Sequence, residues 1–163
     1  MGVSGSGKTS VGAALARAWG FEFVDGDDLH PPANIEKMRG GIPLTDEDRW
    51  PWLEKVGAVM CSALMGGGGI VVACSALRRA YRNRLRLATG EAIRFIYLAV
   101  SREVIADRLA SRSGHFMPAS LIDTQFATLE RPGIDESDAI TVVADGPVAR
   151  VVDAIVAACR RAT

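Results

Sequence analysis

The sequence contains little cysteine and little histidine. Its three cysteines, Cys61, Cys74 and Cys159, are odd in number and far apart along the chain, and there are only two histidines. This pattern excludes a disulfide framework and the usual cysteine–histidine metal sites, and it is typical of reduced thiols in a cytoplasmic protein. We therefore expect a cytoplasmic location.

Long apolar runs and an excess of one charge are missing as well. No apolar stretch approaches the roughly 18 residues of a membrane-spanning helix, and the first residues do not resemble a basic and apolar leader. Lysine plus arginine and aspartate plus glutamate both number 19, so no net basic field favours nucleic acid or an anionic membrane. Sixteen of the basic residues are arginines, whose planar guanidinium suits phosphate and carboxylate groups. We expect no nucleic-acid partner and no membrane association, and for any single arginine a solvated helix face is the more ordinary interpretation.

Strand-like and helix-like segments alternate along the chain. Its 163 residues, 48% of them apolar, are enough for a single domain over residues 1–163 with one core. The alternation predicts an α/β fold with a parallel sheet and helices on both faces. The expected strands span 21–24, 70–74, 93–100 and 140–144, and the expected helices span 8–19, 34–39, 45–65, 77–88, 101–111, 119–129 and 147–161.

The clearest motif is a glycine-rich phosphate loop, because residues 2–9 read GVSGSGKT and match the pattern GxxxxGK[ST] in full. Its glycines let backbone amides point at phosphate oxygens, and the helix that follows adds its positive dipole end. Lys8 is expected to neutralise the β- and γ-phosphates of ATP, and Thr9 to offer its hydroxyl to Mg²⁺. The residues expected to bind ATP are Gly2, Val3, Ser4, Gly5, Ser6, Gly7, Lys8 and Thr9.

A polar turn, Asp25 to His30, follows the strand expected at 21–24. In a parallel sheet the carboxyl ends of the strands face the phosphate loop. One carboxylate of this turn could then hold Mg²⁺ through water, and a second could take a proton from an acceptor hydroxyl. From composition alone, a solvated turn of aspartate and glycine is an equally open interpretation.

Three longer segments resemble the gluconate kinases. They are DGDDLHPPANIEKMRGGIPLTDEDRWPWL at 25–53, ACSALRRAYR at 73–82 and GHFMPASLIDTQFATLE at 114–130. Together with the phosphate loop they cover nearly the whole chain. The resemblance implies a P-loop kinase fold of the nucleoside-monophosphate-kinase type with a lid near 113–118. It also implies a homodimer and transfer of the γ-phosphate of ATP to the C6 hydroxyl of D-gluconate.

The same resemblance implies roles for single residues of the first segment. Asp25 matches the position that helps to place Mg²⁺. Asp27 matches the contact to the acceptor hydroxyl and is the candidate general base. His30 matches a position that lines the sugar-acid pocket, although it could simply shape the turn. Arg49 matches the partner of the gluconate carboxylate.

Arginines supply the other implied contacts. Arg82 lies one helical turn from Arg78, so the two are expected to share a face, and Arg82 is the candidate for a second contact to the acceptor. Arg108 and Arg112 lead into the lid-like segment and are expected to close over ATP, with Arg112 acting at the γ-phosphate beside Lys8. A solvated helix face is the alternative for Arg78.

Two other functions stay open at this point. One is another small-molecule kinase of the same fold, such as a shikimate-type enzyme, against which the LHP and GHFMP runs argue. The other is a nucleotide-binding protein without turnover, and the short stretch before the phosphate loop is its best support.

A phosphate loop normally joins a buried strand to a helix, yet only Met1 precedes Gly2. In the fold that the chain resembles, this strand is central and lies between the strands expected at 70–74 and 93–100. We therefore expect the first strand to be missing and its two neighbours to stand apart. Residues 1–3 would form a stub between them; the rival outcome is a rearranged sheet in which the two neighbours pair directly.

Overall fold

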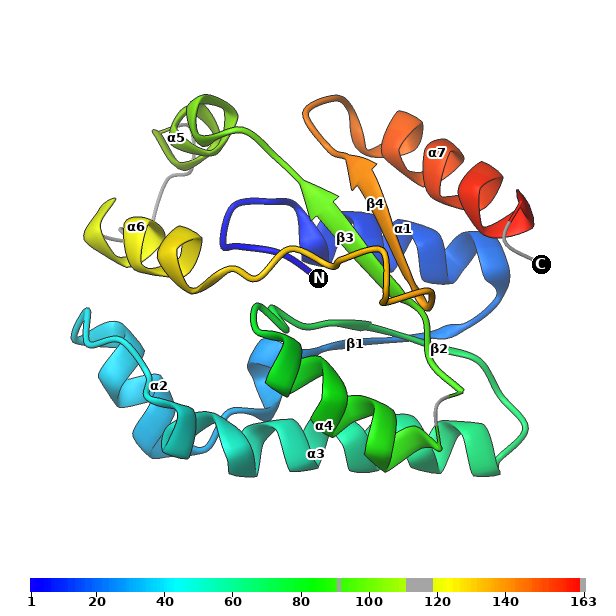
Figure 1. The fold of residues 1–163 in the computed structure, drawn as a ribbon, viewed down its shortest axis with the longest axis horizontal. Helices are drawn as coiled ribbons and strands as arrows, with labels where there is room; N and C mark the ends of the chain where they lie inside the picture. The colour runs from blue at the N-terminus through cyan, green and yellow to red at the C-terminus, as the bar shows by residue number, and fades with distance from the viewer. Residues whose placement is uncertain (91, 111–118, 162–163) are drawn as a thin grey trace.

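The structure is a computed structural model that describes residues 1–90, 92–110 and 119–161, and it confirms the α/β class (Figure 1). The strands are β1 (Glu22–Asp25), β2 (Ile70–Ala73), β3 (Phe95–Ala99) and β4 (Ala139–Val143). The helices are α1 (Lys8–Trp19), α2 (Pro32–Arg39), α3 (Asp46–Met65), α4 (Arg79–Thr89), α5 (Arg102–Ala110), α6 (Ala119–Thr128) and α7 (Val148–Arg161), and a short 3₁₀ helix spans Gly26–Leu29. The lid expected near 113–118 lies outside the described residues.

Local sequence signals explain where several helices begin and end. Before α3, the Thr45 hydroxyl accepts a hydrogen bond from the amide of Asp48, whose carboxylate accepts one from the amide of Thr45. This reciprocal cap satisfies two amides that a helix leaves unpaired. Helix α2 begins at Pro32, earlier than expected, because proline is well suited to a first turn. Helix α1 ends at Gly20, which adopts φ 68°.

The strands form two separate parallel pairs. Strand β1 pairs with β2, from Glu22 beside Ile70 to Asp25 beside Ala73. Strand β3 pairs with β4 from Phe95 beside Ala139 onward. Within the described part of the chain no ladder joins β2 to β3. The expectation that these two strands stand apart is therefore confirmed, and the rearranged sheet is not formed.

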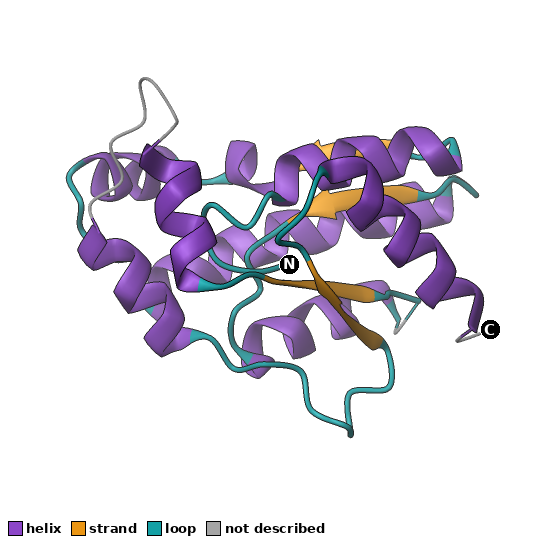
Figure 2. Cartoon of the chain, turned by 90° about the horizontal axis from the view of Figure 1, so that it is seen from above, coloured by secondary structure: helices purple, strands orange, loops and turns teal. Residues whose placement is uncertain are grey.

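The first residues bridge the two pairs, as expected for a stub. The nitrogen of Met1 donates to the carbonyl oxygen of Ile96, and the amide of Leu98 donates to the carbonyl of Met1 at 3.0 Å. On the other side, the amide of Gly2 donates to the carbonyl of Ser75 at 3.1 Å. From above as well, the N-terminus lies between the two pairs of strands (Figure 2).

Helices cover both faces of this strand layer. On one face α1 and α7 pack on β3 and β4, with Leu15 and Ile155 in the centre of that core. On the other face α3 and α4 bury Trp52, Leu53 and Leu85 against β3. A third, smaller cluster sits under the phosphate loop and joins Val3, Leu77 and Ile105 to side chains of α6, namely Ile122 and Phe126.

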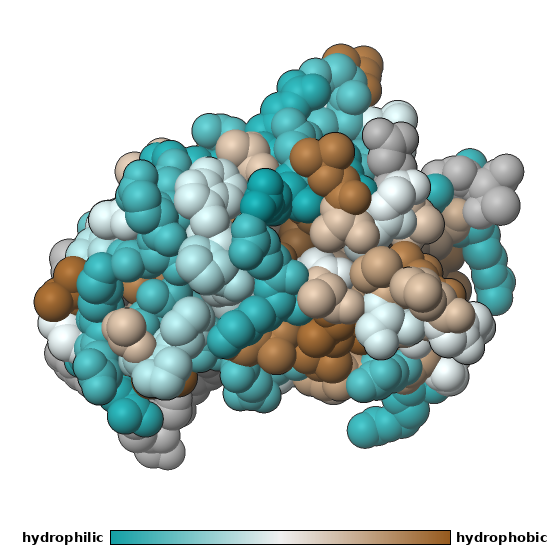
Figure 3. Space-filling model, turned by 90° about the horizontal axis from the view of Figure 1, so that it is seen from below, coloured by the Kyte–Doolittle hydropathy of each residue, from teal (hydrophilic) through white to brown (hydrophobic). Residues whose placement is uncertain are grey.

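The surface mixes hydrophilic and apolar side chains. Seen from below, apolar surface gathers near the middle of the molecule between hydrophilic regions (Figure 3). None of the helices in the described part of the chain combines the length and the apolar character that crossing a membrane requires.

Candidate active site

The phosphate loop has the backbone that its glycines predict. Gly5 and Gly7 adopt φ 78° and 93°, and Gly7 is the residue that precedes α1. These left-handed angles are open to glycine at little cost, so the loop can curl around an anion. The Ser6 hydroxyl is buried and has no hydrogen-bond partner within the described residues. A buried polar atom of this kind fits a loop that receives a polar ligand.

Thr9 and Asp25 meet at the mouth of the loop. The Thr9 hydroxyl donates to Asp25 Oδ2 at 2.7 Å, and Asp25 Oδ1 accepts from the amide of Asp27 at 3.1 Å. A hydroxyl and a carboxylate are hard oxygen ligands of the kind that Mg²⁺ prefers. The described residues contain no group of three or more histidine, cysteine or acidic side chains that could cage a metal. Magnesium sites of kinases need no such cage because phosphate oxygens complete them, so Thr9 and Asp25 fit the ion.

Asp27 is the next carboxylate along the turn. Its pKa is raised, chiefly because the surrounding chain restricts its hydration, and the negative charges of Asp25 and Asp28 add to this effect. The positive charge of Lys8 acts in the opposite direction. The side chain still reaches solvent at the surface of the turn. A carboxylate with a raised pKa beside the loop lysine has the properties of a general base for a hydroxyl group.

The ring of His30 is largely buried, with 8% of the residue exposed. It stacks on Trp52 with the ring centres 4.3 Å apart, and its Nδ1 lies 3.3 Å from the side-chain nitrogen of Asn34. Burial, with the charge of Arg49, lowers its pKa to about 4, so the ring is neutral at physiological pH. The Trp52 indole also donates to the carbonyl of Gly26 at 2.6 Å. These contacts favour the interpretation that His30 shapes the turn.

Arg49 leaves α3 toward Tyr81 of α4. Its guanidinium lies 5.6 Å from the centre of the Tyr81 ring and donates to the carbonyls of Leu44 and Thr45. Arg78 approaches the same ring at 6.0 Å and bonds to Asp46 at 2.6 Å. Two guanidinium groups therefore approach one tyrosine, whose hydroxyl also bonds to Asp46. Arg78 is already paired with that carboxylate, whereas Arg49 contacts neutral oxygens, so it is the charge of Arg49 that can receive an anion. The resemblance implied a role for Arg49 at the acceptor, which stays a prediction, but it gave no role to Tyr81.

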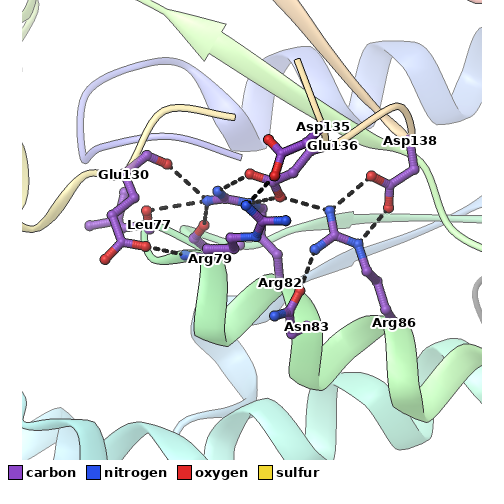
Figure 4. Close-up of polar contacts among 10 residues, drawn as sticks. Leu77, Arg79, Arg82, Asn83, Arg86, Glu130, Asp135, Glu136 and Asp138 are labelled. Carbon is purple, nitrogen blue, oxygen red and sulfur yellow. Dashed lines mark hydrogen bonds and ion pairs between the residues drawn. The ribbon is translucent and has the colours of Figure 1, made fainter. Parts of the chain in front are cut away.

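Arg82 lies elsewhere, inside the protein (Figure 4). It is 0% exposed, and its Nε and one terminal nitrogen bond to the two oxygens of Glu136 at 2.7 and 2.6 Å. Its other terminal nitrogen lies within hydrogen-bonding distance of the carbonyls of Ala76, Leu77 and Glu130. These contacts engage the whole guanidinium, so the arrangement favours a structural role over the expected contact to the acceptor.

The expected common face of Arg78 and Arg82 is wrong. Helix α4 begins at Arg79, and Arg78 is the extended residue before it, with φ −95° and ψ 150°. Helical spacing therefore does not apply to Arg78, whose side chain turns to Asp46. Another arginine of α4, Arg86, shares the carboxylate of Glu136 with Arg82 and also bonds to Asp138. These two carboxylates raise the pKa of Arg86.

Arg108 contacts the phosphate loop, and its expected closure over ATP stays a prediction. One terminal nitrogen lies 3.4 and 3.3 Å from the carbonyls of Gly5 and Ser6, and the other donates to the carbonyl of Ala144 at 2.6 Å. Helix α5 thereby places a positive charge at the back of the loop that is expected to hold ATP. Arg112, expected at the γ-phosphate, lies outside the described residues.

One polar contact to the loop was not predicted. The amide of Ser4 donates to Gln125 Oε1 at 2.6 Å, and Gln125 belongs to α6. The residue stands within the third segment that resembles gluconate kinases, but a lone glutamine on a helix carries no signal of such a contact.

Comparisons with known proteins agree with this geometry. A family model described as shikimate kinase matches residues 4–160. The gluconokinase of Gluconobacter oxydans (strain 621H) is 52% identical over 136 residues, which cover 83% of this chain and 76% of that protein. The chain belongs to the gluconokinase family.

Solved structures separate this family from the broader fold. A gluconokinase from Sinorhizobium meliloti 1021 is 48% identical with a TM-score of 0.90, over 99% of this chain and 89% of that one. Shikimate kinase from Aquifex aeolicus VF5 is 16% identical with a TM-score of 0.54, over 98% and 93% of the two chains. The second likeness shows the fold alone, that of a P-loop kinase.

Proposed function

We propose that this chain transfers the γ-phosphate of ATP to the C6 hydroxyl of D-gluconate and so forms 6-phospho-D-gluconate. The proposed reaction rests mainly on one observation, the 2.7 Å hydrogen bond between the Thr9 hydroxyl and the Asp25 carboxylate. Asp27, the next carboxylate of the same turn, interacts electrostatically with Lys8. The acceptor is supported by the named gluconokinases that the chain resembles at 52% and 48% identity.

The reaction is an in-line displacement in which the protein contributes mainly position and charge. Residues 2–9 hold the phosphates through backbone amides, and Lys8 offsets charge that develops on the transferred group. Thr9 and Asp25 would hold Mg²⁺, which supplies further charge compensation at the β- and γ-phosphates. Asp27 accepts the proton of the C6 hydroxyl. Its raised pKa makes it a stronger base than an ordinary aspartate.

The carboxylate of gluconate is the natural partner of Arg49 beside Tyr81, since Arg78 on the same ring is already paired with Asp46. Arg49 and Arg78 both lie within about 6 Å of that ring, and an arginine fork matches a carboxylate well. A carboxylate held there anchors one end of the sugar acid and leaves its C6 end for the phosphate loop. Arg82 acts indirectly, because its bonds to the carbonyls of Ala76 and Leu77 fix the segment that leads from β2 into α4.

A coupled assay of ADP release tests the proposal. With ATP and Mg²⁺, we expect turnover with gluconate and none with shikimate or a nucleoside monophosphate. Turnover with shikimate alone would favour the shikimate-type alternative, in line with the family model that matches 4–160. Binding of ATP by calorimetry without turnover on any acceptor would favour the nucleotide-binding alternative.

The assembly and location of the chain are further parts of the proposal. We expect a homodimer, on the resemblance described above, and a cytoplasmic location, on the cysteine pattern. Light scattering of the purified chain measures the mass of the particle, and fractionation of cells that express it gives the compartment.

A further inference from the structure

The first turn of α4 takes its cap from another part of the chain. Within the described residues, the side chain of Arg78, which precedes this turn, bonds to no amide of the helix, and the turn itself contains no acidic residue. The first amides of a helix have no partner inside it and need acceptors from elsewhere. The amides of Tyr81 and Arg82 bond to the carbonyl of Arg78, at 3.1 and 3.2 Å, whereas the amide of Arg79 has its acceptor outside α4.

That acceptor is Glu130, which lies just after α6 (Figure 4). Its Oε2 accepts a hydrogen bond from the amide of Arg79 at 2.6 Å. Its own amide donates to the carbonyl of Leu77 at 2.9 Å, and its carbonyl accepts from Arg82 at 3.0 Å. The amide, the carbonyl and the carboxylate of Glu130 therefore all bond to residues 77–82. A carboxylate at the start of a helix also interacts favourably with the helix dipole.

The segment that Glu130 holds contains a strained residue. Residues 74–78 join β2 to α4, and we call them the connector. Within it Ala76, which is 1% exposed, adopts φ 43°. This left-handed region is costly for a residue with a Cβ atom, and such a conformation persists only where surrounding contacts hold it. The carbonyl of the preceding residue accepts from the amide of Gly2, and the carbonyl of the following residue accepts from Glu130.

The first turn of α4 also carries a part of the proposed acceptor site. Tyr81 lies in this turn, and its hydroxyl donates to Asp46 and lies 3.5 Å from a terminal nitrogen of Arg49. Arg49 belongs to α3, so its distance to Tyr81 depends on how the start of α4 is placed. A change in the first turn of α4 therefore reaches the group that we place at the carboxylate of gluconate.

We propose that Glu130 is a positioning residue for the acceptor site, because it caps α4 and holds the connector in the conformation that places Tyr81 beside Arg49. The strain at Ala76 favours release of the connector, and the bonds of Glu130 oppose that release. When a binding-competent conformation is only partly populated, the apparent affinity falls by the populated fraction. Loss of the cap therefore weakens binding of the sugar acid. This inference rests on the proposed function, since its acceptor is gluconate.

Glu130 and Gln125 serve different substrates in this arrangement. Gln125 of α6 accepts from the amide of Ser4 in the phosphate loop, which is the side of ATP. Glu130, just beyond the end of the same helix, bonds to the start of α4, which is the side of the acceptor. The effects of substitutions at the two residues should therefore fall on the KM values of different substrates.

Steady-state kinetics with ATP and gluconate test the proposal. We expect Glu130→Ala to raise the KM for gluconate roughly fivefold, as for the loss of a helix cap. The KM for ATP and kcat should stay within about twofold of the parent values, because the phosphate loop keeps its own contacts. Glu130→Gln keeps an oxygen that can accept from the amide of Arg79, so it should restore most of the affinity. Arg131→Ala, an exposed change at the next residue, is the control and should alter no constant.

Ala76→Gly tests the strain. Glycine adopts a positive φ at little cost, so this change should favour the held conformation of the connector. Added to Glu130→Ala, it should lower the KM for gluconate by at least about twofold, and alone it should not raise that KM. Simple loss of a buried methyl group would have the opposite sign, because it would loosen the connector further.

Amide exchange at Arg79 tests the cap without catalysis. We expect exchange to be roughly fivefold faster in Glu130→Ala than in the parent chain, and close to the parent rate in Glu130→Gln. Unchanged exchange at Arg79 in Glu130→Ala would show that the carboxylate does not cap α4.

Three kinetic results would also overturn the proposal. The first is an unchanged KM for gluconate in Glu130→Ala, or an equal rise in both KM values. The second is the same rise in Glu130→Gln as in Glu130→Ala. The third is no recovery when Ala76→Gly is added. A parent chain without turnover of gluconate would overturn the proposed function and this role with it, whereas turnover with any of the three results overturns this inference alone.

Discussion

Arg82 and Glu136 form a buried two-point ion pair that joins α4 to the segment before β4, with nitrogen–oxygen distances of 2.7 and 2.6 Å. Removal of one partner leaves an uncompensated charge in the core. We expect Arg82→Ala to lower the free energy of unfolding by about 3–5 kcal/mol. Urea denaturation measures the loss. The matched control is Arg79→Ala, whose partner Asp135 and own side chain are 56% and 50% exposed, and which should cost less than about 1 kcal/mol. Equal losses for the two variants would contradict the buried role.

The same pair makes stability depend on pH. Hydrogen bonds from Arg82, with those from Arg86, lower the pKa of Glu136 from 4.5 to about 2. Since the folded pKa is below the unfolded one, the contribution is present above pH 4.5 and is lost as the pH falls toward 2. The loss is roughly 3 kcal/mol. Urea titrations between pH 6 and 2.5 should show this slope in the parent chain and a shallower slope in Glu136→Gln.

Asp27→Asn tests the general base. We expect kcat to fall by roughly 10²–10⁴-fold, because the amide cannot accept the hydroxyl proton. In the parent enzyme the acid limb of the kcat profile should lie above the ordinary aspartate range, because the pKa of Asp27 is raised. Asp28→Asn is the control. It should keep kcat and move the acid limb slightly lower, because the charge of Asp28 helps to raise that pKa. A near-normal kcat in Asp27→Asn would remove Asp27 from this role.

Arg49→Ala tests the carboxylate anchor. The carboxylate of gluconate does not change during the reaction, so Arg49 should contribute to binding equally in the ground state and the transition state. We expect the KM for gluconate to rise by roughly 10–100-fold with little change in kcat. Arg84→Ala is the control, because Arg84 pairs with Glu54 on an exposed surface and should leave both constants unchanged. A fall in kcat with constant KM would point to a different function of Arg49.

Thr9→Ala should raise the Mg²⁺ concentration that gives half-maximal rate, while Thr9→Ser should not. Serine keeps the hydroxyl that bonds to Asp25 and that we place at the metal. Titration of activity with Mg²⁺ at saturating ATP measures the effect. Ser10→Ala is the control for loss of a neighbouring, exposed hydroxyl. A larger effect of Ser10→Ala than of Thr9→Ala would show that the neighbouring hydroxyl serves the ion.

Gln125→Ala removes the bond from α6 to the amide of Ser4. We expect the loop to become less well positioned and the KM for ATP to rise about fivefold, the equivalent of one ordinary hydrogen bond. The KM for gluconate should stay the same, which separates this effect from general destabilisation. Asp123→Asn, an exposed change on the same helix, should alter neither constant.

Much of the fold follows from local signals. The phosphate loop and α1 could be predicted because the glycine pattern and the helical periodicity lie within twenty residues. The separation of β2 from β3 could be predicted as well, since it depends on the order of strands in a known type of sheet. The 3₁₀ helix at Gly26–Leu29 was expected only as a turn, because short helices of this kind leave little trace in sequence.

The position of Arg82 could not be predicted in the same way. Its carboxylate partner, Glu136, is 54 residues away, and no periodicity links the two. An arginine on a polar helix and an arginine in a core network look alike until the partner is known. The error at Arg78 has a more local origin. Helix α4 begins at Arg79, two residues later than expected. Arg78 is therefore extended rather than helical, and its side chain bonds to Asp46.

The indole bond between Trp52 and Gly26 has a mechanical consequence. Trp52 and Arg49 both belong to α3, and the Trp52 bond fastens the turn that carries Asp27 to the same helix. The proposed base, Asp27, and the proposed carboxylate anchor, Arg49, are therefore both attached to α3. If α3 swings during the catalytic cycle, it carries both ends of the sugar acid together, and the gap that changes is the one between the C6 hydroxyl and the phosphate loop.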